Sequence, residues 1–398
     1  ARLIAMLHDP APRRPLYPGE LWGGIGLAAL LFGLFTADTL VPFQPRKLAF
    51  PLVLLFWAPA LVIHECGHAL VARLVGWRVT QMVLGMGPEL MRFHVGETQV
   101  VVRALLVEGY VTPAPKRPGS ARLANALVYL GGPGAELLVA AGIALAWGWD
   151  PFFVRSDDYP LLASQSAALA LMIGAVMNLV PHRMAGAPND GLGILLSAGL
   201  EPHHFDYRLA LPAEREVERA LHAGQLSHAR EVAEREATLH PENAHLGMLA
   251  LRVVAAEGDT EGAITQLEAL RETAPRNPLV EAELLHTAAL IALGSGDPEL
   301  LGRAVQAVRS AMEAGGAAPS YLATLGALLF EQGRMQEAFD ALQLAYKGTR
   351  DPLLEDHCVA YLALVTRALG RTEDHTRFAR ELTRRGTHEH LRRRLVEG

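Results

Sequence analysis

Long stretches without charged side chains are the feature that most constrains the fold of this chain of 398 residues. Residues 21–37 and 48–63 contain no charged side chain, 123–149 contain only Glu136, and 159–181 contain none. A helix that crosses a bilayer needs about 20 apolar residues, so the last two stretches qualify alone and the first two with their flanks. Buried helices of a soluble protein are the weaker interpretation, because four such segments lie within 200 residues. We therefore expect four membrane spans, near residues 21–40, 48–76, 123–149 and 159–181.

The charged residues are divided unequally along the chain. The first 200 residues carry 14 basic and 12 acidic side chains, whereas the remaining 198 carry 22 and 30. The two halves therefore suit different solvents, a bilayer and water. The charge balance gives no sign of nucleic-acid binding. Two cysteines, Cys66 and Cys358, exclude a disulfide framework and fit a reducing compartment for most of the chain.

Basic residues indicate how the spans are oriented. Residues 1–20 and the segment between the second and third spans contain ten arginines and lysines, against three on the opposite side. Because positively charged flanks stay in the cytoplasm, we expect both termini there and the spans in the cell (inner) membrane.

The segment between the second and third spans changes its periodicity. Residues 78–84 and 98–107 are rich in valine and alternate or run apolar, and Gly85, Gly87 and Gly96 interrupt them. This pattern is typical of strands. We expect a small antiparallel sheet within residues 78–112.

The second span contains the motif His64-Glu65-Cys66-Gly67-His68. On a helix, His64 and His68 lie one turn apart on the same face, so both imidazoles can bind one metal ion. Glu65 lies beside the first histidine, where a carboxylate can accept a proton from water activated by zinc. Polar residues in an apolar run are costly unless they are used, so a solvated helix end is the weaker interpretation. Cys66 points away from the ligand face, and we do not expect it to bind metal.

A catalytic zinc ion needs a third protein ligand and one open position. Asp190 is our candidate, because a carboxylate after the last long apolar stretch can complete the site, with Gly191 beside it to relax the backbone. Two alternatives remain. Asp190 can instead be the N-cap of a helix at 191–200, and His182 is a competing ligand.

These residues resemble the site-2 proteases, intramembrane zinc metalloproteases of the M50 group, over about residues 48–200. The motif at His64 is followed by Glu108-Gly109-Tyr110-Val111, which resembles the family's G-G-Y-V. Gly132-Pro133-Gly134-Ala135 resembles G-P-x-A-N, and Asn178 and Pro181 with Asp190-Gly191 resemble N-x-x-P followed by D-G. The resemblance implies cleavage of membrane-embedded helices in regulatory substrates, with the D-G aspartate as third zinc ligand.

Two positions depart from the family pattern or stay ambiguous. Glu136 stands where the family usually has Asn, and it is either a partner of a metal ligand or a polar residue facing a pore. The gap between Pro181 and Asp190 is longer than the commonest form. Asn178 can hydrogen-bond an extended substrate or the developing oxyanion, and an interhelical hydrogen bond is the equal alternative.

The acidic half has a regular punctuation by glycine. Gly224, Gly258, Gly296, Gly333 and Gly370 are spaced by 34, 38, 37 and 37 residues. Small residues and prolines recur at matching offsets, which resembles tetratricopeptide repeats with about five helical hairpins over 212–398. Stacked hairpins expose a concave surface for a partner, although a role in dimerisation or rigidity is the alternative. Residues 201–211 are expected to form a hinge.

The sequence thus predicts a mainly α protein, in which a polytopic membrane domain (21–200) with a small sheet precedes an all-α repeat array. The first hypothesis is a zinc-dependent intramembrane endopeptidase with Zn²⁺ on His64, His68 and Asp190, and with Glu65 as general base. It implies a membrane-protein substrate, contact with the lipid bilayer, and a cytoplasmic protein or peptide at the repeats; a homo-oligomer is left open. The second hypothesis is a membrane-anchored adaptor with a structural or silent metal site. A soluble zincin is a third and weaker alternative, which extraction without detergent would favour.

Overall fold

The computed structural model describes residues 43–117, 121–184, 187–349, 351–385, 391 and 394–395. The chain divides into two compact units, Ala1–Leu209 and Ala210–Gly398, and each is described here by itself. The expected first span near 21–40 and the N-terminal segment 1–20 lie outside the described residues.

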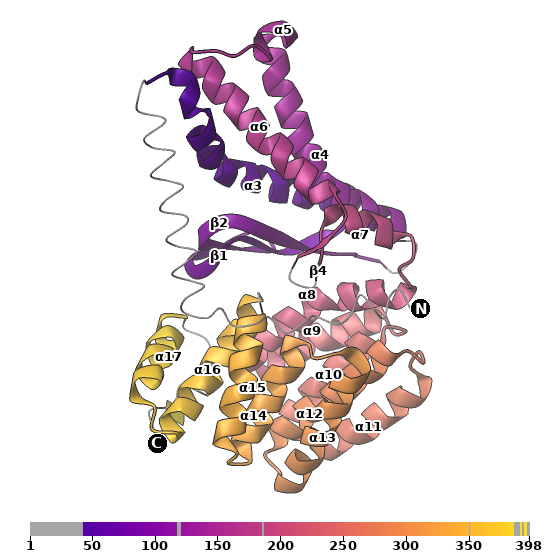
Figure 1. Ribbon diagram of the computed structural model, residues 1–398. Helices are drawn as coiled ribbons and strands as arrows, with labels where there is room; N and C mark the ends of the chain where they lie inside the picture. Colours follow the sequence, from indigo (N-terminus) through magenta and orange to yellow (C-terminus); the bar gives the residue numbers. More distant parts are fainter. Residues whose placement is uncertain are drawn as a thin grey trace. The chain divides into compact units, whose positions relative to one another are not determined.

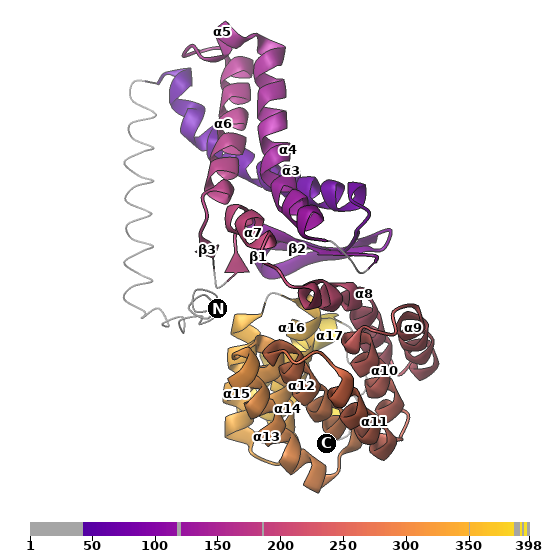
Figure 2. The ribbon, with the colours of Figure 1, turned by 90° about the vertical axis from the view of Figure 1, so that its right-hand side faces the viewer.

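Three long helices form the body of the first unit. They are α3 (Ala49–Leu74), which the 3-10 turn η1 (Pro45–Leu48) precedes, α4 (Arg122–Trp147) and α6 (Tyr159–Leu179). Each is long and apolar enough to cross a membrane, so three of the four expected spans are candidate membrane helices. The three helices pack against one another, as Figures 1 and 2 show. Their outward leucines, valines and phenylalanines are exposed, as lipid contact requires.

Helix α6 begins where its sequence provides start signals. The side chain of Asp158 accepts a hydrogen bond from the backbone N–H of Leu161, and Pro160 occupies the first turn. A short helix, α5 (Trp149–Phe152), lies in the connection between α4 and α6.

The expected sheet is a hairpin of two long antiparallel strands, β1 (Arg78–Val95) and β2 (Thr98–Ala114). Both strands continue beyond the valine-rich stretches and are irregular near Gly85 and Gly87, which have positive φ angles. Residues 81–84 pair with 109–112 and also with 99–102, and 99–102 pair in turn with 91–94. Within the described residues, the segment 109–114 therefore has a partner on one side only and forms an edge of the sheet.

A small turn and a short helix follow α6. Strands β3 (Arg183–Met184) and β4 (Ala187–Pro188) pair with each other, and α7 (Asp190–Ser197) begins two residues later. The longer gap noted after Pro181 thus contains two short paired strands.

The C-terminal part of α8 and nine further helices form the second unit in the part of the chain that the structure describes. They are α8 (Pro202–His222), α9 (Leu226–Leu239), α10 (Ala244–Ala256), α11 (Thr260–Thr273), α12 (Pro278–Ser295), α13 (Pro298–Gly315), α14 (Pro319–Glu331), α15 (Met335–Gly348), α16 (Pro352–Ala368) and α17 (Thr372–Arg385). Neighbours in sequence pack as pairs, for example α12 with α13 and α14 with α15. The five regularly spaced glycines all adopt positive φ angles at the ends of helices α8, α10, α12, α14 and α16. The stretch 201–211, expected as a hinge, lies almost wholly within α8.

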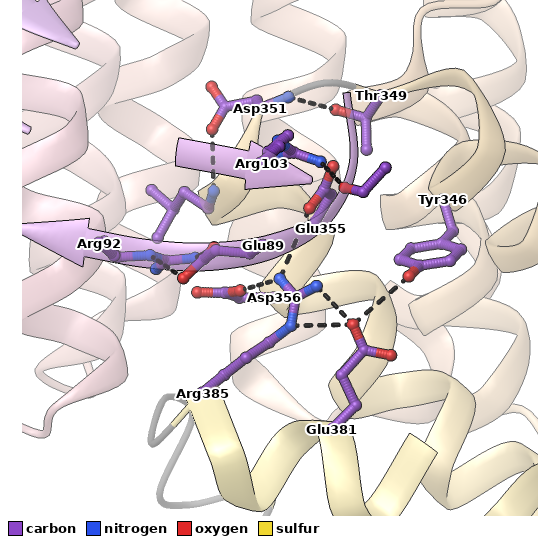
Figure 3. A network of polar contacts seen from close by, with 12 residues as sticks. Glu89, Arg92, Arg103, Tyr346, Thr349, Asp351, Glu355, Asp356, Glu381 and Arg385 are labelled. Carbon is purple, nitrogen blue, oxygen red and sulfur yellow. Dashed lines mark hydrogen bonds and ion pairs between the residues drawn. The ribbon is translucent and has the colours of Figure 1, made fainter. Parts of the chain in front are cut away.

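An ion-pair network holds the last two of these helices together (Figure 3). The guanidinium of Arg385 on α17 is 2.5 Å from Asp356 on α16 and 2.5 Å from Glu381 on its own helix. Glu355 lies 3.6 Å away, and Tyr346 donates its hydroxyl to Glu381. The side chain of Arg385 is only 6% exposed, so its charge needs these carboxylates.

Candidate metal centre

Three donor side chains from α3 and α7 converge on one point. His64 and His68 project from α3 one turn apart, and their Nε2 atoms are 3.0 Å from each other. Asp190, the first residue of α7, lies 3.0 Å from Nε2 of His64 and 3.3 Å from Nε2 of His68. These three residues form a group that could hold a metal ion, with one ligand atom from each within 4.8 Å of the others.

The geometry of the donors fits zinc. Tetrahedral zinc with ligands at about 2.0–2.1 Å places neighbouring donor atoms roughly 3.3 Å apart. The separations of 3.0, 3.0 and 3.3 Å are close to that value. Two imidazoles and one carboxylate are also a donor set that catalytic zinc sites use. Three protein ligands leave the fourth position of the metal open for water or substrate.

Asn189 explains locally how Asp190 reaches the histidines. Its side-chain oxygen accepts hydrogen bonds from the backbone N–H groups of Leu192 and His182, so Asn189 is the N-cap of α7. Its amide nitrogen lies 2.8 Å from the carbonyl oxygen of Asn178 and 2.7 Å from that of Val180. One buried side chain therefore joins the end of α6 to the start of α7, and Asp190 follows it directly.

Glycines allow the backbone to approach the donors closely. A Cβ atom on Gly132 of α4 would lie 2.4 Å from Nε2 of His68, and one on Gly191 would lie 2.0 Å from the carbonyl oxygen of Leu179. Any side chain at these positions would displace the imidazoles or α7. The small residues in this region thus serve close packing around the site.

The second nitrogen of each imidazole has a different partner. Nδ1 of His64 lies 2.9 Å from the carboxylate of Glu136 on α4, whereas Nδ1 of His68 lies 2.7 Å from the carbonyl oxygen of Val128. Both contacts are buried, and they orient both rings with Nε2 toward Asp190. The structure thus favours the first of the two roles considered for Glu136, that of a partner of a metal ligand.

Glu65 is buried beside this group. Its residue is 3% exposed, and its Oε2 atom has no hydrogen-bond partner among the described residues. Gly109, on the edge segment of β2, packs directly over it, since a Cβ atom there would lie 2.8 Å from Oε1 of Glu65. A buried carboxylate oxygen without a partner is costly, and it suits a group that handles a proton or faces a cation.

The structure separates the alternatives left open for the other candidates. His182 is exposed and outside the donor group, while Asp190 is within it and Asn189 is the helix cap. Asn178 lies in the last turn of α6, and its side chain donates to the carbonyl oxygen of Gly174 in the same helix. Cys66 is exposed and also outside the donor group.

Some residues of the site have only weak signals in the sequence. Asn189 could have been found as an N-cap residue before an apolar helical run. The carbonyl of Val128 and the packing of Gly109 over Glu65 have no such signal, because they depend on contacts between distant segments.

Comparison with known proteins agrees with this geometry. Residues 52–148 match the model of peptidase family M50. Zinc metalloprotease Rip1 of Mycobacterium tuberculosis is 31% identical over 107 residues, which covers 22% of this chain and 26% of Rip1. A Synechocystis sp. protein that carries a zinc metalloprotease name is 40% identical over 63 residues, which is 16% of this chain and 17% of that protein.

The chain therefore spans about a sixth to a quarter of the length of the curated relatives it matches. The matched part contains the histidine motif on α3 and the whole of α4. Residues 52–148 are thus similar to peptidase family M50, and zinc is the metal that the names of the relatives and the donor set imply.

Proposed function

We propose that this chain is a zinc-dependent intramembrane endopeptidase, which hydrolyses a peptide bond in or near the transmembrane helix of a membrane protein. The observation that carries the proposal is the meeting of His64, His68 and Asp190 beside the buried Glu65, with both histidines and Glu65 on a helix long enough to span a bilayer. An adaptor with a silent metal site has no need for a buried carboxylate without a hydrogen-bond partner.

The roles of the residues follow from their chemistry. Zinc bound by His64, His68 and Asp190 would polarise the scissile carbonyl and activate water. Glu65 accepts the proton from the attacking water and then donates it to the leaving amine. The glycines let the backbone pack closely against the imidazoles, and this packing restricts the access of bulk water to the reacting groups.

The substrate has to be unwound before it can react, because a helix shields its own peptide carbonyls. The edge segment 109–114 supports a model in which the unwound strand is held by added backbone hydrogen bonds next to Glu65. Asn178, at the end of α6, is our candidate for a hydrogen bond to that strand. Its present bond to Gly174 lies within one helix and can be exchanged for one to substrate.

The second unit is proposed to be a tetratricopeptide-like array that binds a cytoplasmic protein or peptide. The support is the succession of paired helices and the regular glycines at helix ends. We place this unit and both termini in the cytoplasm and the spans in the cell (inner) membrane, because of the bias in basic residues.

The decisive experiment compares Glu65→Gln with Cys66→Ala, a change at the neighbouring exposed residue outside the donor group. Glu65→Gln is expected to keep zinc and to lower the cleavage rate by about 10²–10⁴-fold, since it removes only the proton acceptor. Cys66→Ala is expected to keep both the bound zinc and the cleavage rate of the parent. Cleavage is measured on membrane proteins that co-purify with the Glu65→Gln variant. Full activity of that variant would refute the proposal.

A further inference from the structure

We propose that Glu136 is a positioning residue of the metal centre, whose carboxylate holds the imidazole of His64 and strengthens that ligand's bond to the metal. This inference rests on the proposed function, because it takes zinc to be bound by His64, His68 and Asp190.

The direction of the hydrogen bond follows from the positions of the two nitrogens. Nε2 of His64 faces the other donors, at 3.0 Å from both His68 and Asp190. An imidazole that binds metal through Nε2 keeps its proton on Nδ1. Nδ1 of His64 therefore donates to Oε2 of Glu136, which is 2.9 Å away. This bond fixes both the tautomer and the rotation of the ring.

The two histidine ligands differ in the charge of their partners. The partner of His68 is the neutral carbonyl of Val128, at 2.7 Å, whereas the partner of His64 is a carboxylate. A carboxylate makes the imidazole it contacts more electron-rich, and so a stronger ligand. Glu136 is therefore expected to contribute metal affinity in addition to orientation.

The third helix makes room for this carboxylate. A Cβ atom on Gly174 of α6 would lie 2.4 Å from Oε1 of Glu136, so no other residue fits there without moving the carboxylate. Glu136 itself is 2% exposed. His64, Glu136 and Gly174 belong to α3, α4 and α6, and all three helices thus converge on one contact.

The charge of the metal supplies a further reason to expect the Glu136 carboxylate beside this site. A carboxylate buried between membrane-spanning helices is costly unless an opposite charge is close. With zinc bound, Asp190 and Glu136 together carry two negative charges against two positive ones. The positive charges of the metal then offset the cost of burying the Glu136 carboxylate in a medium of low dielectric constant.

The test measures metal binding directly, on the purified full-length protein in detergent. The zinc dissociation constant is obtained by competition with a chromophoric chelator for the parent, Glu136→Gln and Glu136→Leu. Glu136→Leu is expected to weaken zinc binding by about 10–100-fold. Glu136→Gln is expected to weaken it less, because the amide oxygen still accepts the bond from Nδ1 but carries no charge. The absorption bands of bound Co²⁺ should shift in both variants, which a merely structural change remote from the ligands would not cause.

A second pair of variants reaches the same contact without changing Glu136. Gly174→Ala places a methyl group against its carboxylate and is expected to weaken zinc binding. Gly134→Ala is the matched control, since it lies on α4 close to Glu136 and a Cβ atom there meets nothing within 4 Å. It is expected to bind zinc like the parent.

The outcomes separate this inference from the proposed function. If the parent binds zinc and both Glu136→Gln and Gly174→Ala bind it equally tightly, with unchanged Co²⁺ spectra, the role of Glu136 is refuted and the protease proposal stands. If the parent binds no zinc, both are refuted. Graded weakening from Gln to Leu supports the positioning role, and Glu136→Gln and Gly174→Ala decide the matter even where Glu136→Leu does not fold.

Discussion

At the scale of single residues, the side-chain amide of Asn189 connects the metal donor Asp190 to the helical bundle. Asn189 is 7% exposed and bonds to the backbone on both sides of the turn between α6 and α7. Its loss would leave carbonyls at the end of α6 and N–H groups at the start of α7 without their partner. Asp190 depends on this connection, because it follows Asn189 and has to reach two imidazoles on another helix.

We expect Asn189→Ala to lower both stability and metal affinity. Removing a buried side chain that satisfies several backbone groups costs about 1–3 kcal/mol of unfolding free energy. The looser start of α7 then weakens the zinc site. The measurements are thermal unfolding followed by circular dichroism and zinc binding by chelator competition.

The control is Asn178→Ala, which removes only a bond to a carbonyl of its own helix. This variant is expected to keep zinc and nearly all of its thermal stability. Equal zinc affinity and unfolding temperature in Asn189→Ala and Asn178→Ala would contradict the special role of Asn189.

At the scale of elements, α3 and α4 meet through glycine, and this contact sets the position of the histidines. A Cβ atom on Gly67 would lie 2.3 Å from the carbonyl oxygen of Gly131, and one on Gly131 would lie 2.8 Å from that of Gly67. In a bilayer, helices associate through such small residues, because apolar burial offers little gain between lipid-facing surfaces. Since Gly67 lies between the two histidines, the same contact holds the metal ligands against α4.

Gly67→Ala is therefore expected to separate α3 from α4. Overpacking of a close contact costs about 1–3 kcal/mol, and here it also moves both imidazoles relative to Glu136 and Val128. A lower unfolding temperature together with weaker zinc binding should be seen. Gly142→Ala, on α4 where a Cβ atom meets nothing within 4 Å, should change neither quantity. A Gly67→Ala protein with the parent's zinc affinity would show that the helices adjust without cost.

At the scale of the whole molecule, the two halves handle charge in opposite ways. The first unit brings buried charged groups together at the metal centre, whereas the helices of the second unit pair charges with neighbouring helices. Arg252 on α10 lies 2.8 Å from Glu218 and 3.7 Å from Glu214, both on α8. Burial, and then the repulsion from Glu218, raise the pKa of Glu214 to about 8, while Arg252 helps to keep the pKa of Glu218 below its usual value against the effect of burial.

This arrangement predicts a pH-dependent effect of Glu214→Gln. A carboxyl group whose pKa is raised in the folded state binds its proton more tightly there, so folding loses stability as the pH rises from about 4.5 to 8. The variant cannot ionise and escapes this loss. Its unfolding temperature, followed by circular dichroism, should exceed the parent's by a margin that grows over this pH range. Each kcal/mol of unfolding free energy that the variant retains corresponds to a difference on the order of 2–4 °C.

Two comparisons complete the pH experiment. Glu234→Gln, at an exposed position on α9, should show a margin that does not change with pH. A constant difference between Glu214→Gln and the parent from pH 5 to pH 8 would argue against a raised pKa for Glu214.

Much of the first unit could be predicted because its signals are local or compositional. A run of apolar residues indicates a spanning helix whatever it packs against, and the three expected spans within the described residues are helices long and apolar enough to cross a membrane. The alternation after Arg78 indicates strands, but it does not reveal that the segment 99–102 pairs on both sides. The stretch 201–211, for which a hinge is expected, is helical from Pro202 onward, and the boundary between the two units lies within it.

The sequence by itself determined the apolar spans, the pairing of His64 with His68, and the positions of helix ends at glycine in the second unit. Each of these depends on residues within a few turns of one another. Only the tertiary structure decided that Asp190 joins the histidines while His182 remains outside, that Glu136 contacts His64, and that Gly109 covers Glu65. The physical reason is that these contacts join segments from different helices and a strand, whose distances are set by close packing and not by spacing along the chain.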